Sequence, residues 1–164
     1  MIKIFGVGNT LLCDEGVGVK VIEKLQDRLI KLNDIINDNN KISVVIGETD
    51  YLFCLDSISD EDFIIIVDST YFMIRPGTIT VRSLNECDEL ISTDFVNDLS
   101  PHEESFIKTL RREKSNMQGY LIGIEIGRID YSLELSKDLN NNFNNICENV
   151  YNDILKIISD YNNK

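Results

Sequence analysis

The stretch IKIFGVGNTLLCDEGVGVKVIEKLQDRL, residues 2–29, decides the fold because it predicts a strand, a loop and a helix in succession. Residues 2–7 form an apolar run that stops at glycine and asparagine, which is typical of a buried strand. Further on, apolar side chains recur every three or four positions and predict an amphipathic helix: Val17, Val21, Ile22, Leu25 and Leu29. The adjacent carboxylates Asp14 and Glu15 therefore lie where the helix begins.

Strands and helices alternate along the rest of the chain. Strands are predicted over residues 41–47, 62–70, 75–83 and 119–127, and helices near residues 52–58, 106–110 and 139–158. The 62–70 strand is almost wholly apolar, so we expect it to be covered on both faces, whereas the Pro-Gly turn before the 75–83 strand favours an edge. This alternation predicts an α/β protein with a single domain over residues 1–164. We expect a mostly parallel twisted sheet sandwiched between helices (α/β/α).

The composition restricts the classes of protein that the chain can represent. Its 164 residues, 43% of them hydrophobic, suit one domain with one sizeable core. No apolar run approaches the ~20 residues that span a bilayer, and the chain opens on a strand rather than a leader peptide, so we expect a cytoplasmic protein without membrane contact. A net charge of −12 disfavours nucleic-acid binding. The cysteines lack C-x-x-C spacing and suit reduced thiols: Cys13, Cys54, Cys87 and Cys147.

Polar groups follow the carboxyl ends of the predicted strands, where the functional groups of parallel sheets gather. Asp68 ends an apolar strand, and a carboxylate there needs a hydrogen bond, an ion pair or a cation, unless it simply caps the following turn. His102, the single histidine, precedes a predicted helix and is either a capping residue or a metal ligand. One histidine with two carboxylates at the same edge of the sheet would form a three-ligand metal site with an open position.

The first loop allows other interpretations. Asp14 fits a helix N-cap, and acidic residues suit the first helical turn. Gly16 and Gly18 are costly inside a helix, so they indicate close approach of another backbone or a ligand. A dinucleotide site is a weaker alternative: GVGN lacks the third glycine of the fingerprint, and carboxylates would repel a pyrophosphate, although Glu48 suits a ribose-binding acid.

Several segments, in order, resemble the hydrogenase maturation proteases, the endopeptidases that trim the C-terminus of the large subunit of nickel–iron hydrogenases. GVGNTLLCDEGVGV, residues 6–19, is similar to the family's opening motif Gly-x-Gly-Asn-x-Leu-x-x-Asp-Glu-Gly-x-Gly-Val. The later matches are shorter: IIIVDS (64–69), PGTI (76–79), LSPHEESF (99–106) and GYLIGIEI (119–126). The resemblance thus spans residues 1 to about 126.

The resemblance implies an α/β/α sandwich and an aspartic-type endopeptidase. It implies a metal triad of Glu15, Asp68 and His102, with Glu15 and Asp68 also serving in catalysis, and it makes Asp14 a helix-capping partner. The divalent metal ion is then nickel already loaded into the substrate, and the partner is the hydrogenase large-subunit precursor. We expect the protein itself to be a monomer.

The chain departs from the family pattern after its second strand. The family usually carries Asp-Gly-Gly-Thr there, whereas this chain has Ile46-Gly47-Glu48-Thr49. Glu48 is a candidate catalytic substitute, because residues 46 and 48 point to the same side of an ideal strand. The alternative is an exposed acid in a turn. Ile126 also stands where the family commonly has proline.

Two mechanisms and one rival function remain open. In the first mechanism the metal acts as a template and Lewis acid, and in the second a carboxylate is the general base while the metal serves only recognition. The rival is a non-catalytic nickel-sensing or chaperone module that keeps the metal triad. The missing acid at Ile46 favours that rival.

Overall fold

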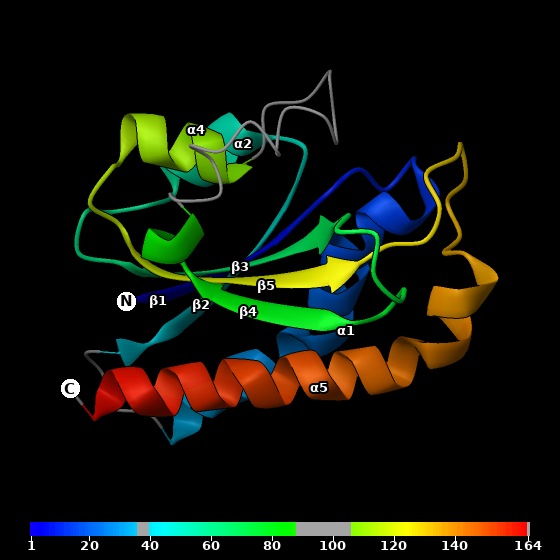
Figure 1. Ribbon diagram of the computed structural model, residues 1–164. Coiled ribbons are helices and arrows are strands. Elements are labelled where there is room, and N and C mark those ends of the chain that lie inside the picture. Colours follow the sequence, from blue (N-terminus) through cyan, green and yellow to red (C-terminus); the bar gives the residue numbers. More distant parts are fainter. Residues whose placement is uncertain (36–39, 88–105, 164) are drawn as a thin grey trace.

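A five-stranded sheet forms the centre of the computed structural model, which describes residues 1–35, 40–87 and 106–163 (Figure 1). Its strands are Ile2–Val7 (β1), Ile42–Glu48 (β2), Phe63–Thr70 (β3), Ile79–Ser83 (β4) and Gln118–Glu125 (β5). They are ordered β2-β1-β3-β5-β4, all parallel except β4, which pairs antiparallel with β5 at one edge. The predicted mostly parallel sheet is confirmed, with the strand after the Pro-Gly turn at its edge.

Helices cover both faces of the sheet (Figure 1). On one face lie Val17–Lys31 (α1) and Lys137–Asn162 (α5), and on the other lie Tyr51–Asp56 (α2) and Phe106–Glu113 (α4). Two short 3₁₀ helices, Cys13–Gly16 (η1) and Leu32–Asp34 (η2), flank α1. The predicted sandwich is therefore confirmed. Within the described ranges, no helix combines the length and apolar character needed to cross a membrane.

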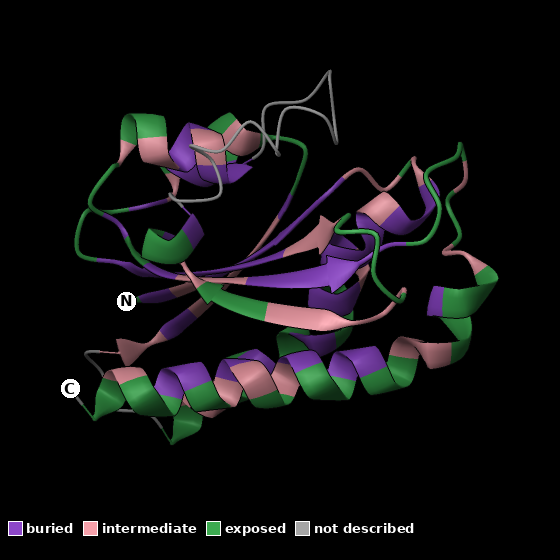
Figure 2. Ribbon diagram, viewed as in Figure 1, coloured by how far each residue is buried: buried purple, intermediate pink, exposed green. Residues whose placement is uncertain are grey.

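The central strand β3 divides its side chains between two hydrophobic cores. Phe63, Ile65 and Val67 pack with α1 and α5, whereas Ile64 and Ile66 pack with α2 and α4. All five are buried, as Figure 2 shows for the middle of the sheet. The prediction that this strand is covered on both faces is confirmed, because side chains alternate between the faces of a strand.

Gly18 allows α1 to begin directly against the carboxyl ends of two strands. A Cβ atom on Gly18 would lie 2.4 Å from the carbonyl oxygen of Val67 and 2.6 Å from that of Val7. A Cβ atom on Gly16 would lie 2.7 Å from the Cα atom of Thr10. The prediction that both glycines mark close approach is confirmed. The residues just before α1 are consequently held beside the ends of β1 and β3.

Gly18→Ala tests this contact. The added methyl group would overlap two backbone oxygens that cannot move independently of the sheet, so we expect the free energy of unfolding to fall by about 3 kcal/mol. Urea denaturation measures the change. Glu23→Ala, an exposed substitution on the same helix, is the control and should change the free energy by less than about 0.5 kcal/mol. Equal stabilities for the two variants would contradict the close packing.

Candidate active site

Glu15 and Asp68 lie together at the carboxyl end of the sheet. Asp68 is near the end of β3, half-buried, and its Oδ1 atom accepts a hydrogen bond of 2.7 Å from the backbone N–H of Ser69. Glu15 belongs to η1, is half-buried, and has its Oε2 atom shielded from solvent. The charge of Glu15 acts on Asp68. The structure thus brings together two of the three predicted metal ligands.

The surroundings of Asp68 favour its protonated form. The pKa of Asp68 is raised to about 7. Burial is the main cause and the negative charge of Glu15 adds to it, while the hydrogen bond from the Ser69 N–H group acts in the opposite direction. A carboxyl group with a pKa near neutrality can both accept and donate a proton under physiological conditions. Asp68 therefore has the properties of a general acid–base group.

The third predicted ligand, His102, lies outside the described residues. Within the ranges that the structure describes, no group of three His, Cys, Asp or Glu side chains is arranged to hold a metal ion. The pair of Glu15 and Asp68 nevertheless fits a divalent cation, because a positive charge between them would offset the repulsion and the burial that raise the pKa of Asp68. The role of His102 stays a prediction.

Asp14 does not cap its own helix, so the N-cap prediction is wrong. The N-cap residue of α1 is Gly16, which makes no side-chain capping bond. Asp14 is instead fully buried within η1 and binds the segment that follows β5. Its Oδ2 atom accepts hydrogen bonds from the N–H groups of Gly127 (3.1 Å) and Arg128 (3.0 Å), and its Oδ1 atom accepts one from Ser136 (2.7 Å).

Backbone hydrogen bonds reinforce the link that Asp14 makes between these two loops. The N–H group of Cys13 donates to the carbonyl oxygen of Ser132 at 2.8 Å, and the N–H group of Ser132 donates to that of Leu11 at 3.0 Å. The loop after β1 and the loop after β5 therefore form one unit across the end of β3. Glu15 is the next residue after the carboxylate that anchors this unit, so its backbone position is set by that anchor.

A bulge at the end of β2 changes the position of Glu48. Gly6 pairs with Ile46 but Val7 pairs with Glu48, so one extra residue interrupts the strand. Glu48 has a φ of +46° and is exposed. The expected alternation of residues 46 and 48 does not apply here, because a bulge breaks the alternation of side chains. A catalytic role for Glu48 stays a prediction, without the geometric argument that motivated it.

Helix α2 closes over this bulge. A Cβ atom on Gly47 would lie 2.2 Å from the Sγ atom of Cys54, so the thiol occupies the space that any other residue would need. Burial raises the pKa of the Cys54 thiol to about 12. The end of β2 is thus packed tightly under α2 even though Glu48 itself is exposed.

Sequence reasoning missed Glu125, a fully buried carboxylate at the end of β5. It receives hydrogen bonds from the backbone N–H groups of Phe72 and Ile74, in the loop that follows β3. In the sequence it is one polar residue in the apolar run GYLIGIEI, and this interruption of the run was the available signal. A charge buried there needs strong partners.

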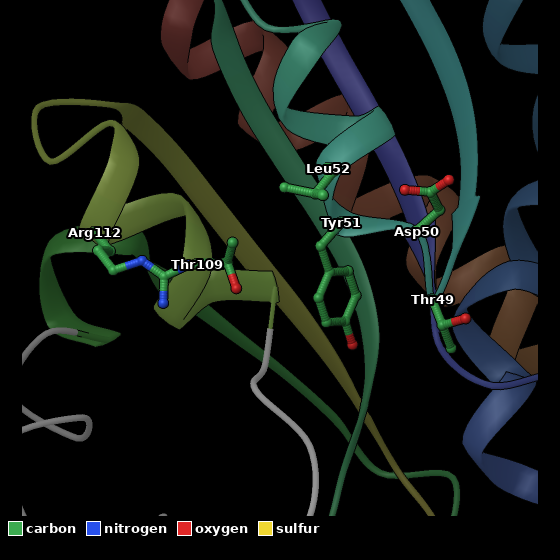
Figure 3. A pocket seen from close by; sticks show the side chains of 6 residues that line it. All are labelled: Thr49, Asp50, Tyr51, Leu52, Thr109 and Arg112. Carbon is green, nitrogen blue, oxygen red and sulfur yellow. The ribbon is translucent and has the colours of Figure 1, made fainter.

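A cavity of about 480 Å³ lies at the start of α2. Figure 3 shows its lining: Thr49, Asp50, Tyr51, Leu52, Thr109 and Arg112. Asp50 accepts a hydrogen bond from the N–H group of Phe53 and so caps α2. The cavity lies between the start of α2 and α4, and neither Glu15 nor Asp68 lines it.

Comparisons with known proteins identify relatives of this chain. It is 33% identical over 103 residues to the hydrogenase 2 maturation protease of Escherichia coli K12, a match that covers 62% of this chain and 56% of that protein. It is 33% identical over 96 residues to a putative hydrogenase maturation protease of Methanocaldococcus jannaschii, covering 57% of each. Its fold matches the hydrogenase maturating endopeptidase HybD from E. coli with a TM-score of 0.73 and 22% identity, over 94% of this chain and 92% of that one.

The chain is similar in sequence and in fold to hydrogenase maturation proteases. The resemblance that the sequence motifs predicted is therefore confirmed. No protein-family model matches the chain. The chain spans about half the length of the curated relatives it matches.

Asp14→Ala tests whether this carboxylate anchors the two loops. Asp14→Ala would leave three backbone N–H groups without their acceptor, so we expect the free energy of unfolding to fall by roughly 3 kcal/mol or more. Asp27→Ala, which removes an exposed aspartate from α1, is the control and should be nearly neutral. Urea denaturation of both variants measures the difference. A loss below about 1 kcal/mol for Asp14→Ala would contradict the anchoring role.

The second test concerns the pH dependence that Asp68 introduces. Its pKa is 3.8 in a solvated aspartate and about 7 in the folded protein. Between these values the folded protein holds a proton that the unfolded chain has lost, so the stability that Asp68 contributes decreases as the pH rises from about 4 to about 7. Asp68→Asn removes this titration.

Chemical denaturation in the presence of a chelator, from pH 5 to pH 8, measures the effect above the isoelectric point of about 4.4. The wild type should lose stability relative to Asp68→Asn as the pH rises to about 7, and the difference should then level off. A difference that is constant over this range would mean that Asp68 titrates as a solvated carboxyl group.

Proposed function

We propose that this protein is an endopeptidase that removes the C-terminal peptide from the large-subunit precursor of a nickel–iron hydrogenase. The single observation that carries the proposal is that Glu15 and Asp68 lie at the carboxyl end of the sheet, near enough for the charge of Glu15 to act on Asp68. Similarity to proteins that are named hydrogenase maturation proteases supports the reaction and the class of substrate. We place this reaction in the cytoplasm, since Cys13, Cys54, Cys87 and Cys147 form no disulfide bond with one another.

The carboxylate pair supplies the proton transfers that peptide hydrolysis needs. Asp68 in its ionised form takes a proton from a water molecule, whose oxygen then bonds to the scissile carbonyl carbon. The C–N bond breaks as Asp68 returns the proton to the leaving amine nitrogen. The pKa of about 7 suits both transfers near neutral pH. These steps are those of an aspartic-type endopeptidase.

Nickel enters as part of the substrate. Glu15, Asp68 and His102 would bind the nickel ion that is already loaded into the precursor. Carboxylate and imidazole groups suit such an ion. The bound ion would polarise nearby carbonyl groups. A precursor without nickel leaves the two carboxylates to repel each other, so it binds less well. Processing would then act as a test for completed metal insertion.

Three single substitutions test the triad. Glu15→Gln, Asp68→Asn and His102→Ala should each reduce processing of a nickel-loaded precursor by about 100-fold or more, without lowering the melting temperature. Cleavage is measured as the mobility shift of the precursor on a gel. Asp27→Asn, an exposed substitution on α1, is the control and should process normally.

Two further results would discriminate among the roles. Processing that survives Glu15→Gln and Asp68→Asn together would overturn the proposal that this pair performs the chemistry. Glu48→Gln is compared in the same assay, since unchanged cleavage by that variant would remove Glu48 from the catalytic residues. A wild-type protein that binds nickel-loaded precursor without cleaving it would instead be a sensing module.

A further inference from the structure

Four consecutive apolar side chains are exposed immediately after β3. Tyr71 and Phe72 are each 42% exposed, Ile74 is 44% exposed and Met73 is 74% exposed. Tyr71 follows Asp68 by only three residues. Single exposed apolar side chains are common on protein surfaces, but a contiguous group of them often marks a binding surface.

Glu125 fixes the conformation of this loop. Its Oε1 atom accepts hydrogen bonds from the N–H groups of Phe72 (2.8 Å) and Ile74 (3.1 Å). Its Oε2 atom accepts one from the hydroxyl group of Thr70 at 3.3 Å. Between the two backbone donors, Met73 has a φ of +59°. The backbone of the loop therefore faces the buried carboxylate, and the four side chains are left on the outside.

Two neighbouring loops continue the apolar surface. Leu11, in the loop after β1, is 61% exposed, and in the loop after β5 Ile129, Tyr131 and Leu133 are 52%, 90% and 67% exposed. The three loops lie at the end of the sheet to which β3 and β5 point, with exposed segments there (Figure 2). They also contact one another: a Cβ atom on Gly127 would lie 2.9 Å from the ring of Pro76, and Ser132 donates a hydrogen bond to Leu11.

We propose that this surface, formed by residues 11, 71–74, 129, 131 and 133 and called here the apolar rim, binds apolar side chains of the large-subunit precursor beside its cleavage site. The inference rests on the proposed function, since it names how the same site holds its substrate. Glu125 is then a positioning residue for the rim. A loop that a buried carboxylate holds in one conformation loses less entropy when a partner binds.

Continuity and charge support this occupant. Residues 71–74 follow Asp68 by three to six positions, so the rim adjoins the place where the scissile peptide bond would be held. The chain carries a net charge of −12, but the rim side chains themselves are uncharged, so they offer apolar contact to the precursor. A folded precursor needs a contact surface of roughly 1,000 Å² or more for specific binding, far beyond the two carboxylates.

The test measures cleavage kinetics and binding with a nickel-loaded large-subunit precursor. In the rim variant Phe72→Gln/Met73→Asn, asparagine tolerates the positive φ at position 73, so the loop keeps its backbone conformation. We expect KM and Kd to rise at least tenfold, equivalent to about 1.4 kcal/mol, with kcat within twofold. The matched control Ile30→Gln/Ile35→Asn removes exposed apolar groups (49% and 82%) near the far end of α1 and should leave KM unchanged.

Substitution of Glu125 tests its positioning role. Glu125→Ala should raise KM as the rim variant does, and Glu125→Gln should recover part of the loss, because its amide oxygen can still accept a hydrogen bond. A purely structural role would lower the melting temperature without separating KM from kcat. If Glu125→Ala does not fold, the KM values of Glu125→Gln and of the rim variant decide whether Glu125 positions the rim.

The outcomes separate this inference from the proposed function. A wild type that cleaves the precursor, with wild-type KM and Kd in the rim variant, would overturn the inference and leave the function intact. A wild type that binds but does not cleave, with binding lost in the rim variant, would support the inference and overturn the function. A wild type that neither binds nor cleaves would overturn both.

Discussion

The buried carboxylate of Asp14 is the interaction on which the rest of the site depends. It accepts three backbone hydrogen bonds from residues 127, 128 and 136, and so joins the loop after β1 to the loop after β5 over the end of the central strand. Charge-assisted hydrogen bonds to backbone N–H groups are stronger than neutral ones. Because Glu15 is the next residue and the anchored backbone of η1 fixes its position, an acid beside Asp68 is a consequence of this anchor.

Buried carboxylates serve two different purposes at this end of the sheet. Asp14 and Glu125 are surrounded by backbone donors and hold loops in place. Burial of Asp68, together with the negative charge of Glu15, raises its pKa and favours the protonated form, against a single N–H donor. Two of these acids thus organise the loops, and Asp68 is the one whose pKa of about 7 suits proton exchange.

The sequence predicts the parts of this structure that depend on local periodicity. The apolar run that ends at Asp68, the helical stripe from Val17 to Leu29 and the close approach of Gly18 all follow from patterns within a few residues of chain. The partners of Asp14 do not, because they lie 113 to 122 residues away and bind through backbone atoms that carry no sequence signal. An aspartate before a helix fits an N-cap equally well in sequence.

The same distinction applies to Glu48 and Glu125. Alternation along β2 holds only for a regular strand, and neither the bulge at Gly47 nor the packing of Cys54 against it is visible in the sequence of the strand itself. Glu125 interrupts an apolar run, but its partners are the N–H groups of a loop some fifty residues earlier. Glu15 and Asp68 were found because they combine strand-end position with a specific motif. His102, outside the described residues, rests on its motif alone.

The packing of Cys54 over Gly47 makes the thiol a chemical reporter of motion. With a pKa of about 12 and no exposed surface, Cys54 is inert to alkylating reagents while α2 lies against the end of β2. Its rate of alkylation therefore records how often that helix separates from the strand. The glycine and the cysteine also constrain each other in engineering, because a side chain larger than hydrogen at position 47 requires the thiol to move or position 54 to hold a smaller residue.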